Sequence, residues 1–307
     1  MDRWNGFLKI SLNPNTNSHY NVAASLCISP SSKTLIVPSA NAIFFNGDRV
    51  EGTGNPLIER LSDTRNIAEI LVSKLGVTVN AYVVEASNFN GSFVVYDDFI
   101  PSVNSWGKPK CYDPRGFPAS NATVLLLSKC LEEAKKLVHG EQQEPLAGAS
   151  TSCTRPPKTI LFGFSKGGII LNQLVTELAY SKLESPITPT CIILDSRDVF
   201  LNNIYEIHYI DVGLNSAGAY ITDHSVIEKI AENRTSEIRF VLHGTPRQWC
   251  DRRRPWIREE KDILFQMLED AARKTAGQVQ VLNRFYFSDR HPNLQMHFEI
   301  IESLDVS

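Results

Sequence analysis

The sequence predicts an α/β fold with a mostly parallel central sheet and helices on both of its faces. Short apolar segments typical of buried strands alternate with longer segments in which apolar residues recur at helical spacing, and one strand meets its helix in a glycine-rich turn. Apolar residues make up 42% of the 307 residues and charged residues 21%, which suits a substantial core and argues against global disorder. We expect a single domain over residues 1–307.

The amino-terminal half is predicted to contain four strands and two helices. Short apolar or alternating segments predict the strands, and apolar residues three and four positions apart predict the helices. The first two strands are expected to form an edge hairpin or the first antiparallel strands of the sheet. The strands lie at 7–12, 21–28, 42–45 and 77–85, and the helices at 66–75 and 119–138.

Two stretches among these elements are irregular. Residues 88–118 are rich in loop-forming residues and aromatic rings; they could line a substrate pocket, but a packed surface loop whose rings cover the core is favoured. Residues 139–157 are mostly small or polar, which is typical of a flexible insertion and not of a domain boundary.

The carboxyl-terminal half repeats strand and helix, as expected for a doubly wound parallel sheet. Strands are predicted at 160–162, 206–210, 238–242 and 279–287, a further short strand is possible at 190–194, and helices are predicted at 169–178, 225–232, 255–276 and 297–304. Because the carboxyl ends of parallel strands share one edge of a sheet, we expect the functional residues to gather at that edge.

The turn after the strand at 160–162 carries the clearest functional signal. Residues 163–167 read Gly-Phe-Ser-Lys-Gly, a G-x-S-x-G motif between an apolar strand and an amphipathic helix. This context is typical of the nucleophile elbow of the α/β-hydrolase fold, in which a strained turn presents the serine hydroxyl above the sheet. We therefore expect Ser165 to be a nucleophile. The alternative is an ordinary strand–turn–helix with an idle serine.

A serine hydroxyl is a poor nucleophile without a base, and in this fold the base is a histidine after the last strand. His291 and His297 both follow that strand. His297 is favoured because a predicted helix begins there, whereas His291 lies in a polar turn beside Pro292. We expect an imidazole nitrogen of His297 to lie within hydrogen-bond distance of the Ser165 hydroxyl.

Two aspartates are candidates for the acid that orients the histidine. Asp211 directly follows the strand at 206–210 and is favoured. Asp251 follows the next strand, the commoner location in hydrolases, but stands several residues beyond its end and could be a helix N-cap. Both aspartates remain candidates.

Two main-chain amides are expected to form an oxyanion hole. One is the amide of Lys166, directly after the candidate nucleophile, and the other lies near Asn46 and Gly47, in the loop that follows the strand at 42–45. Such donors stabilise the tetrahedral intermediate of acyl transfer. An ordinary Asn-Gly turn explains the second position equally well.

Neither a metal nor an organic cofactor is expected. The six cysteines are scattered with no C-x-x-C pair, and a net charge of −3 gives no case for a nucleic-acid partner. No apolar run approaches the length of a transmembrane segment, and the amino terminus shows no clear targeting peptide. We expect an intracellular protein, cytoplasmic or mitochondrial.

Several motifs along the chain resemble the eukaryotic "chromosome two open reading frame sixty-nine" family. They are 45–48, 96–99, 162–167, 171–174, 211–213, 245–248, Asp251, 255–257 and 297–298. The resemblance implies an α/β-hydrolase-like fold with a presumed serine-esterase site that includes Ser165 and His297, and it leaves both acids possible. It also implies the mitochondrial association of the animal members. The chain departs from the animal pattern at Gly168, where that family can carry cysteine.

Two functions are therefore compared. The favoured one is a serine hydrolase that cleaves an ester or thioester, with a small molecule or a lipid as substrate. The alternative is a non-catalytic protein of the same fold that binds a lipid or a protein partner, because a fold does not guarantee its chemistry. The sequence identifies neither the substrate nor the oligomeric state.

Overall fold

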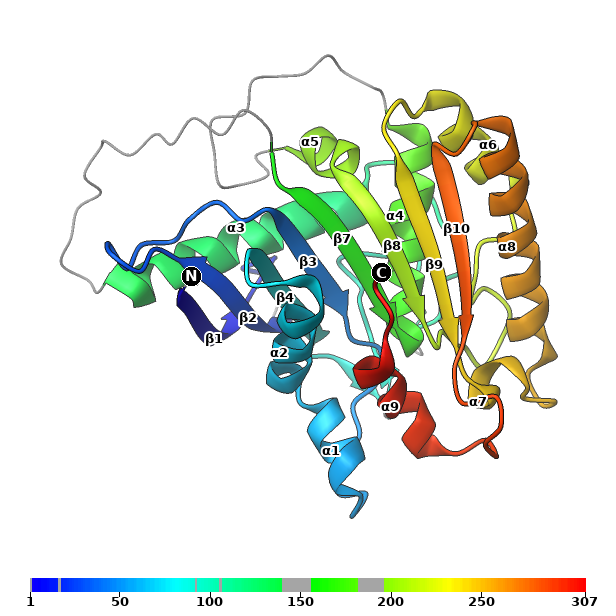
Figure 1. Cartoon of the computed structure of the whole chain (residues 1–307), viewed down its shortest axis with the longest axis horizontal. Coiled ribbons are helices and arrows are strands. Elements are labelled where there is room, and N and C mark those ends of the chain that lie inside the picture. The colour runs from blue at the N-terminus through cyan, green and yellow to red at the C-terminus, as the bar shows by residue number, and fades with distance from the viewer. Residues whose placement is uncertain (1, 16–17, 92, 105–106, 140–155, 182–195) are drawn as a thin grey trace.

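An eight-stranded sheet, strongly twisted, forms the centre of the protein (Figure 1). The computed structural model describes residues 2–15, 18–91, 93–104, 107–139, 156–181 and 196–307. The strands are ordered β1-β2-β4-β3-β7-β8-β9-β10 across the sheet. Their bounds are β1 Asp2–Ile10, β2 Tyr20–Ile28, β3 Ala40–Phe45, β4 Val79–Ala86, β7 Lys158–Phe164, β8 Ile204–Ile210, β9 Ile238–Gly244 and β10 Val279–Phe285. A separate two-stranded ribbon joins β5 Phe89–Asn90 to β6 Phe93–Val94.

Within the described part of this sheet, the strands from β4 through β3, β7, β8 and β9 to β10 pair in parallel, whereas β1–β2 and β2–β4 are antiparallel. The two amino-terminal strands therefore form the predicted antiparallel edge of a mostly parallel sheet. The middle strands are apolar along almost their whole length because both of their faces are covered; every residue of β3 and β4 is buried.

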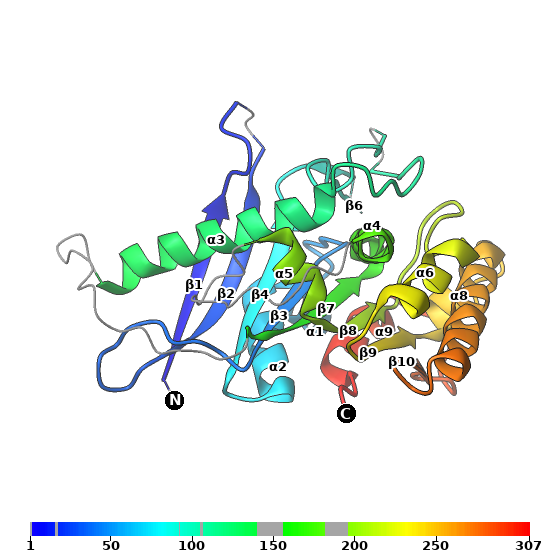
Figure 2. The ribbon, with the colours of Figure 1, turned by 90° about the horizontal axis from the view of Figure 1, so that it is seen from above.

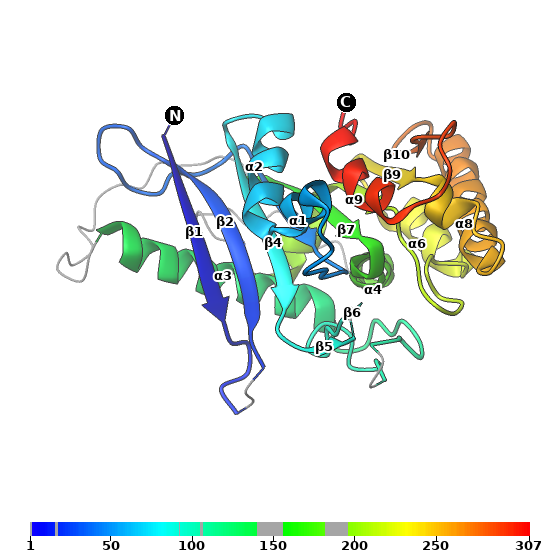
Figure 3. The ribbon, with the colours of Figure 1, turned by 90° about the horizontal axis from the view of Figure 1, so that it is seen from below.

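Helices cover both faces of the sheet, as Figures 2 and 3 show from opposite sides. The cores show the same division: α3, α4, α6 and α8 contribute to the core on one face, and α1, α2 and α9 to the core on the other. The bounds are α1 Pro56–Ser62, α2 Thr64–Leu75, α3 Pro118–His139, α4 Gly168–Tyr180, α5 Arg197–Asn202, α6 His224–Asn233, α7 Pro246–Trp249, α8 Pro255–Lys274 and α9 Leu294–Ser303.

The carboxyl ends of the parallel strands point to the lower edge of the sheet in Figure 1, where α7 and α9 lie. The segment after β10 turns back toward the middle of the sheet, so that α9 contacts α1 and α7. This return brings the end of the chain to the strand ends that carry the predicted site residues.

Most predicted elements are confirmed within a few residues. The first strand, predicted at 7–12, spans Asp2–Ile10, so its predicted start is wrong by five residues. The short helices α1, α5 and α7 were not predicted, because each has only a few residues and no full amphipathic period. The last helix begins at Leu294 with Asn293 as its N-cap, so that the predicted start at His297 is wrong by one turn. Most of the predicted insertion at 139–157 and the possible strand at 190–194 lie outside the described residues.

Candidate active site

Ser165 lies at the turn between β7 and α4, where a short 3-10 turn, Ser165–Gly167, joins strand to helix. Its φ of 50° is in the left-handed region, which a residue with a side chain adopts only at a cost. The strain is typical of a nucleophile elbow and agrees with the prediction from the motif. The serine is only 3% exposed, so a substrate needs an opening to reach it.

Two glycines let the elbow pack against the loop that follows β3. A Cβ atom on Gly47 would lie 2.3 Å from the backbone nitrogens of both Lys166 and Gly167. A Cβ atom on Gly167 would lie 2.0 Å from the carbonyl oxygen of Phe45. These backbones can approach so closely only because neither glycine has a side chain.

His297 and Asp211 form a buried pair at this edge of the sheet. His297 Nδ1 lies 2.6 Å from Asp211 Oδ2, and the two residues are 1% and 0% exposed. Thr245 completes the carboxylate's bonding: its N–H donates to Oδ1 over 2.8 Å and its hydroxyl to Oδ2 over 3.1 Å. Asp211 itself has a φ of 43°, a second strained backbone beside the serine. The motif at 245–248 contributes to the family resemblance, but the sequence analysis assigned no role to Thr245.

The competing candidates lie apart from this pair. Asp251 accepts hydrogen bonds from the Arg253 N–H and the Arg254 guanidinium, so that it caps the turn before α8 and does not orient the histidine. His291 is exposed on the loop between β10 and α9. The geometry thus pairs His297 with Asp211 and corrects the inclusion of Asp251.

Asp48 is the residue that the sequence analysis missed. Its Oδ2 accepts a hydrogen bond from Ser165 Oγ over 2.7 Å and lies 2.9 Å from His297 Nε2. The expected direct hydrogen bond is absent: Ser165 and His297 are both described residues, and no hydrogen bond joins their side chains. Instead, the same carboxylate oxygen, Asp48 Oδ2, is the hydrogen-bond partner of both. Its position directly after Asn46-Gly47, at a strand end facing the elbow, was the available signal.

Carboxylates at both ring nitrogens control the protonation of His297. Burial disfavours the charged imidazole, but the hydrogen bonds to Asp211 and Asp48 and the charges of these two carboxylates outweigh it and raise the pKa of His297 to about 9. The ring also packs against Phe164, with centroids 4.6 Å apart. The raised pKa favours the imidazolium form, which can donate a hydrogen bond to each of the two carboxylates.

The oxyanion-hole prediction needs one correction. The Asn46 N–H donates to the Val84 carbonyl over 2.9 Å, and the Asn46 side chain donates to Glu85, so that this residue extends the contact with β4. Its amide is therefore not available to a substrate. Gly47 lies directly against the Lys166 amide, which leaves these two positions as the candidate donors.

The Lys166 side chain adds a buried cation near the site. Lys166 is 4% exposed, and its Nζ lies beside Gly107 in the irregular stretch at 88–118. Burial lowers its pKa to about 8, although the charge of Asp48 favours the ammonium. A positive charge near Asp48 partly offsets the cost of holding two carboxylates close together.

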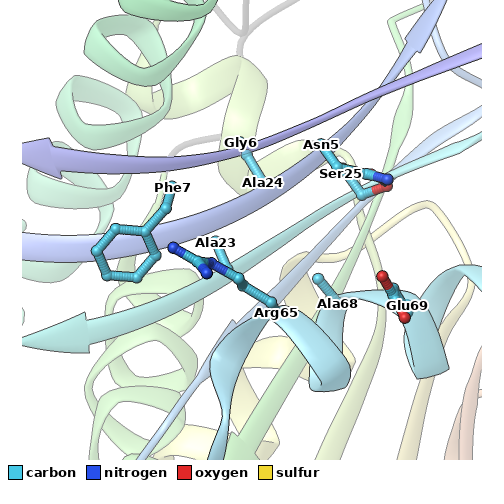
Figure 4. Close-up of a pocket in the computed structure, with 9 residues that line it drawn as sticks. All are labelled: Asn5, Gly6, Phe7, Ala23, Ala24, Ser25, Arg65, Ala68 and Glu69. Atoms are coloured by element: carbon cyan, nitrogen blue, oxygen red, sulfur yellow. Dashed lines mark hydrogen bonds between the residues drawn. The ribbon is translucent and has the colours of Figure 1, made fainter.

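A pocket of about 310 Å³ lies far from these residues along the sheet, between β1, β2 and α2 (Figure 4). Arg65 extends across it toward Phe7, with its guanidinium carbon 5.1 Å from the ring centroid. The residues that line this pocket include no nucleophile beside a base, and Ser165, His297, Asp211 and Asp48 are not among them. It is therefore not the candidate active site.

Two kinds of feature are absent from the described residues. No group of three or more histidine, cysteine, aspartate or glutamate residues in this part of the chain is arranged to hold a metal ion. No helix built from these residues is long and apolar enough to cross a membrane.

Among solved structures, a siderophore hydrolase, EstA from Aspergillus nidulans, superposes with a TM-score of 0.51 at 11% identity. The match covers 97% of this chain and 92% of that one. A likeness at this identity shows the fold alone, and the fold is that of the α/β hydrolases.

Proteins of similar sequence identify the family, which the structural likeness does not. A Mus musculus protein named "Mitochondrial protein C2orf69 homolog" is 31% identical over 144 residues, which are 46% of this chain and 34% of that protein. A Danio rerio protein of the same name is 25% identical over 225 residues, 72% of this chain and 59% of that protein. The chain thus matches less than two thirds of the length of either relative. The model of the C2orf69 family matches residues 119–274, about half of the chain, and the protein belongs to that family.

Proposed function

We propose that this protein is a serine hydrolase that cleaves an ester or thioester, with a small molecule or a lipid as substrate. The single observation that carries the proposal is the bonded series from Ser165 through Asp48 and His297 to Asp211 at the carboxyl edge of the sheet. A hydroxyl on a strained elbow, a titratable imidazole and a buried carboxylate are the groups that acyl transfer through a serine requires.

In this proposal the Ser165 oxygen attacks the carbonyl carbon and forms an acyl-enzyme, which water then hydrolyses. His297 carries protons during both steps, and Asp211 holds its Nδ1–H and thereby its orientation. The amides of Lys166 and Gly47 would bind the oxyanion of the tetrahedral intermediate. None of these roles needs a metal or an organic cofactor.

An active-site-directed fluorophosphonate tests the proposal, because it labels a serine only when the hydroxyl is activated. Intact-mass spectrometry should show one adduct, and peptide mapping should assign it to Ser165. Ser165→Ala should abolish labelling. Ser120→Ala is a matched control, because the buried Ser120 hydroxyl also donates to a carboxylate, Glu177, in a cluster without histidine. An unlabelled, folded wild-type protein would favour the non-catalytic binding function instead.

We also propose that the protein acts in mitochondria, as the names of its relatives state for those proteins. Fluorescent tagging of the full-length protein in cells of its source organism tests this proposal. Co-localisation with a mitochondrial marker is expected, and a diffuse cytoplasmic signal would contradict it.

A further inference from the structure

Asp48 occupies the position that a base must have to take a proton from Ser165. Its Oδ2 is 2.7 Å from Ser165 Oγ, and the hydroxyl is the donor in this hydrogen bond. The same oxygen is 2.9 Å from His297 Nε2. Asp48 thus contacts both groups between which a proton must move.

His297 has no free lone pair to offer the serine while it is protonated. Both ring nitrogens face carboxylate oxygens, Asp211 at Nδ1 and Asp48 at Nε2, and an imidazolium donates from both. Such a ring can give a proton but cannot take one. The acceptor nearest to the Ser165 hydroxyl is therefore the carboxylate of Asp48.

The two carboxylates also differ in their bonding. Both Asp211 oxygens accept hydrogen bonds, from Thr245 and from His297. In the described part of the chain, Asp48 Oδ1 is buried without a hydrogen-bond partner. Asp48 can therefore still accept a hydrogen bond or a proton at Oδ1, whereas both oxygens of Asp211 already accept hydrogen bonds. Asp211 thus suits an orienting role, and Asp48 suits proton transfer.

We propose that Asp48 is a further catalytic residue, the base that takes the Ser165 proton, and that His297 acts as the paired acid. The proposal rests on the proposed function and assigns its proton-transfer steps. It uses the bonded arrangement as it stands, without a rearrangement that would bring Ser165 and His297 into direct contact.

In the acylation step the Ser165 O–H bond breaks, its proton binds Asp48 Oδ2, and Oγ bonds to the carbonyl carbon. When the intermediate collapses, the bond to the leaving group breaks and the His297 Nε2 proton goes to the leaving oxygen or sulfur. The proton on Asp48 then passes to Nε2 across the 2.9 Å contact and restores carboxylate and imidazolium. Deacylation repeats the sequence with water, and His297 returns a proton to Ser165.

The pH dependence of Ser165 labelling tests the proposal without any knowledge of the substrate. Fluoride leaves the fluorophosphonate without needing a proton, so the second-order rate constant reports the base. With Asp48 as base, this constant should stay nearly flat from about pH 6 to about pH 8, because His297 does not have to lose a proton before the serine is activated. If neutral His297 were the base, labelling would climb about tenfold per pH unit toward its pKa of about 9. That climb would overturn the proposal.

Substitution gives a second test. Asp48→Asn should lower the labelling rate constant by about 10²–10⁴-fold, the usual contribution of a general base, and Asp48→Glu should recover part of the loss. Asp98→Asn is the matched control, because Asp98 also accepts a hydroxyl hydrogen bond, from Tyr20, outside the site. Equal or faster labelling of Asp48→Asn would show that Asp48 obstructs the serine and would overturn the proposal. Failure of the wild type to label at all would instead contradict the proposed function.

Discussion

Three buried histidines lie along this sheet in two separate clusters of polar residues, and the clusters differ in what faces each imidazole. His297 has a carboxylate at each nitrogen. In the second cluster, the His208 Nε2 lies 3.0 Å from Glu206, its Nδ1 lies 3.0 Å from His243, and His243 in turn contacts the Tyr286 hydroxyl over 2.9 Å. All three histidines are at most 1% exposed, so burial alone does not separate them.

The neighbours give the histidines opposite protonation. Burial lowers the pKa of His208 in spite of its contact with Glu206, and burial together with His208 and Arg284 lowers the pKa of His243 well below its ordinary value. At His297 the two carboxylates outweigh burial and raise the pKa to about 9. The comparison shows that the paired carboxylates, and not burial, set the direction of the pKa shift, and that the second cluster is a hydrogen-bonded network that joins β8, β9 and the segment after β10.

Among substitutions at the partners of the histidines, the largest expected effect is at Asp211, the carboxylate that faces His297 Nδ1. Asp211→Asn should lower turnover by about 10⁴-fold, because the imidazole loses the carboxylate that fixes its tautomer and orientation. Asp251→Asn should retain the wild-type rate, since the Asp251 carboxylate accepts its hydrogen bonds from Arg253 and Arg254, in the turn before α8. Steady-state ester hydrolysis by both variants checks this prediction. A large loss of turnover in Asp251→Asn alone would mean that Asp251, and not Asp211, orients the histidine.

The next effect concerns the glycine contact at the elbow. Gly47→Ala should lower turnover by about 10²–10³-fold, the usual effect of losing one oxyanion donor, because the new methyl group would displace the loop from the Lys166 amide. Gly54→Ala is the control in the same loop: a Cβ atom there would meet nothing within 4 Å, so its cost is confined to the backbone strain of a φ of 67° and should appear in thermal unfolding without a loss of turnover. Kinetics and thermal unfolding of both variants measure the difference. Unchanged turnover in Gly47→Ala would remove this region from the site.

The protonation states can be read directly by nuclear magnetic resonance of nitrogen-15-labelled histidines. His297 should keep both ring protons up to a pKa of about 9, and His208 and His243 should be neutral at pH 6.5, the ordinary histidine value.

The same pKa shifts determine how the free energy of unfolding changes with pH. The raised pKa of His297 adds stability that is complete below about pH 6.5 and lost as pH rises through about 9, whereas the lowered pKa values remove stability as pH falls below about 6.5. A neutral His297 at pH 7 would contradict the comparison.

The smallest expected effect is in the second cluster. Tyr286→Phe removes the hydroxyl that contacts His243 and accepts from the Asp305 N–H. It should lower the free energy of unfolding by roughly 1 kcal/mol and leave turnover near the wild-type value. Chemical denaturation and steady-state kinetics check both parts. A loss of turnover of about 100-fold would mean that this cluster takes part in the chemistry.

The sequence predicted the fold and much of the site because strand ends determine where residues meet. The apolar strand before Ser165 and the helix after it predicted the elbow, and the position of Asp211 directly after β8 predicted its place at the same edge. Chain order favoured His297 over His291, and the structure pairs it with Asp211.

Other features depend on contacts that no local pattern contains. Asp48 follows Asn46-Gly47 at a strand end, which places it at the functional edge but does not separate it from an ordinary turn residue. The closeness of this loop to Ser165 gives Asp48 its role. The occupied amide of Asn46 depends likewise on the β4 carbonyl beside it. Asp251 resembled a catalytic acid because it follows β9, but its distance from the strand end favours an Arg254 pair.

The most direct test of the account is hydrolysis itself. Purified wild-type protein and Ser165→Ala should be compared on p-nitrophenyl butyrate and on an acyl thioester of the same chain length. The account predicts turnover by the wild type and a loss of about 10⁶-fold in the variant, the scale seen when a catalytic serine is removed. Equal rates for the two proteins, or no turnover by a folded wild type across both substrates, would contradict it.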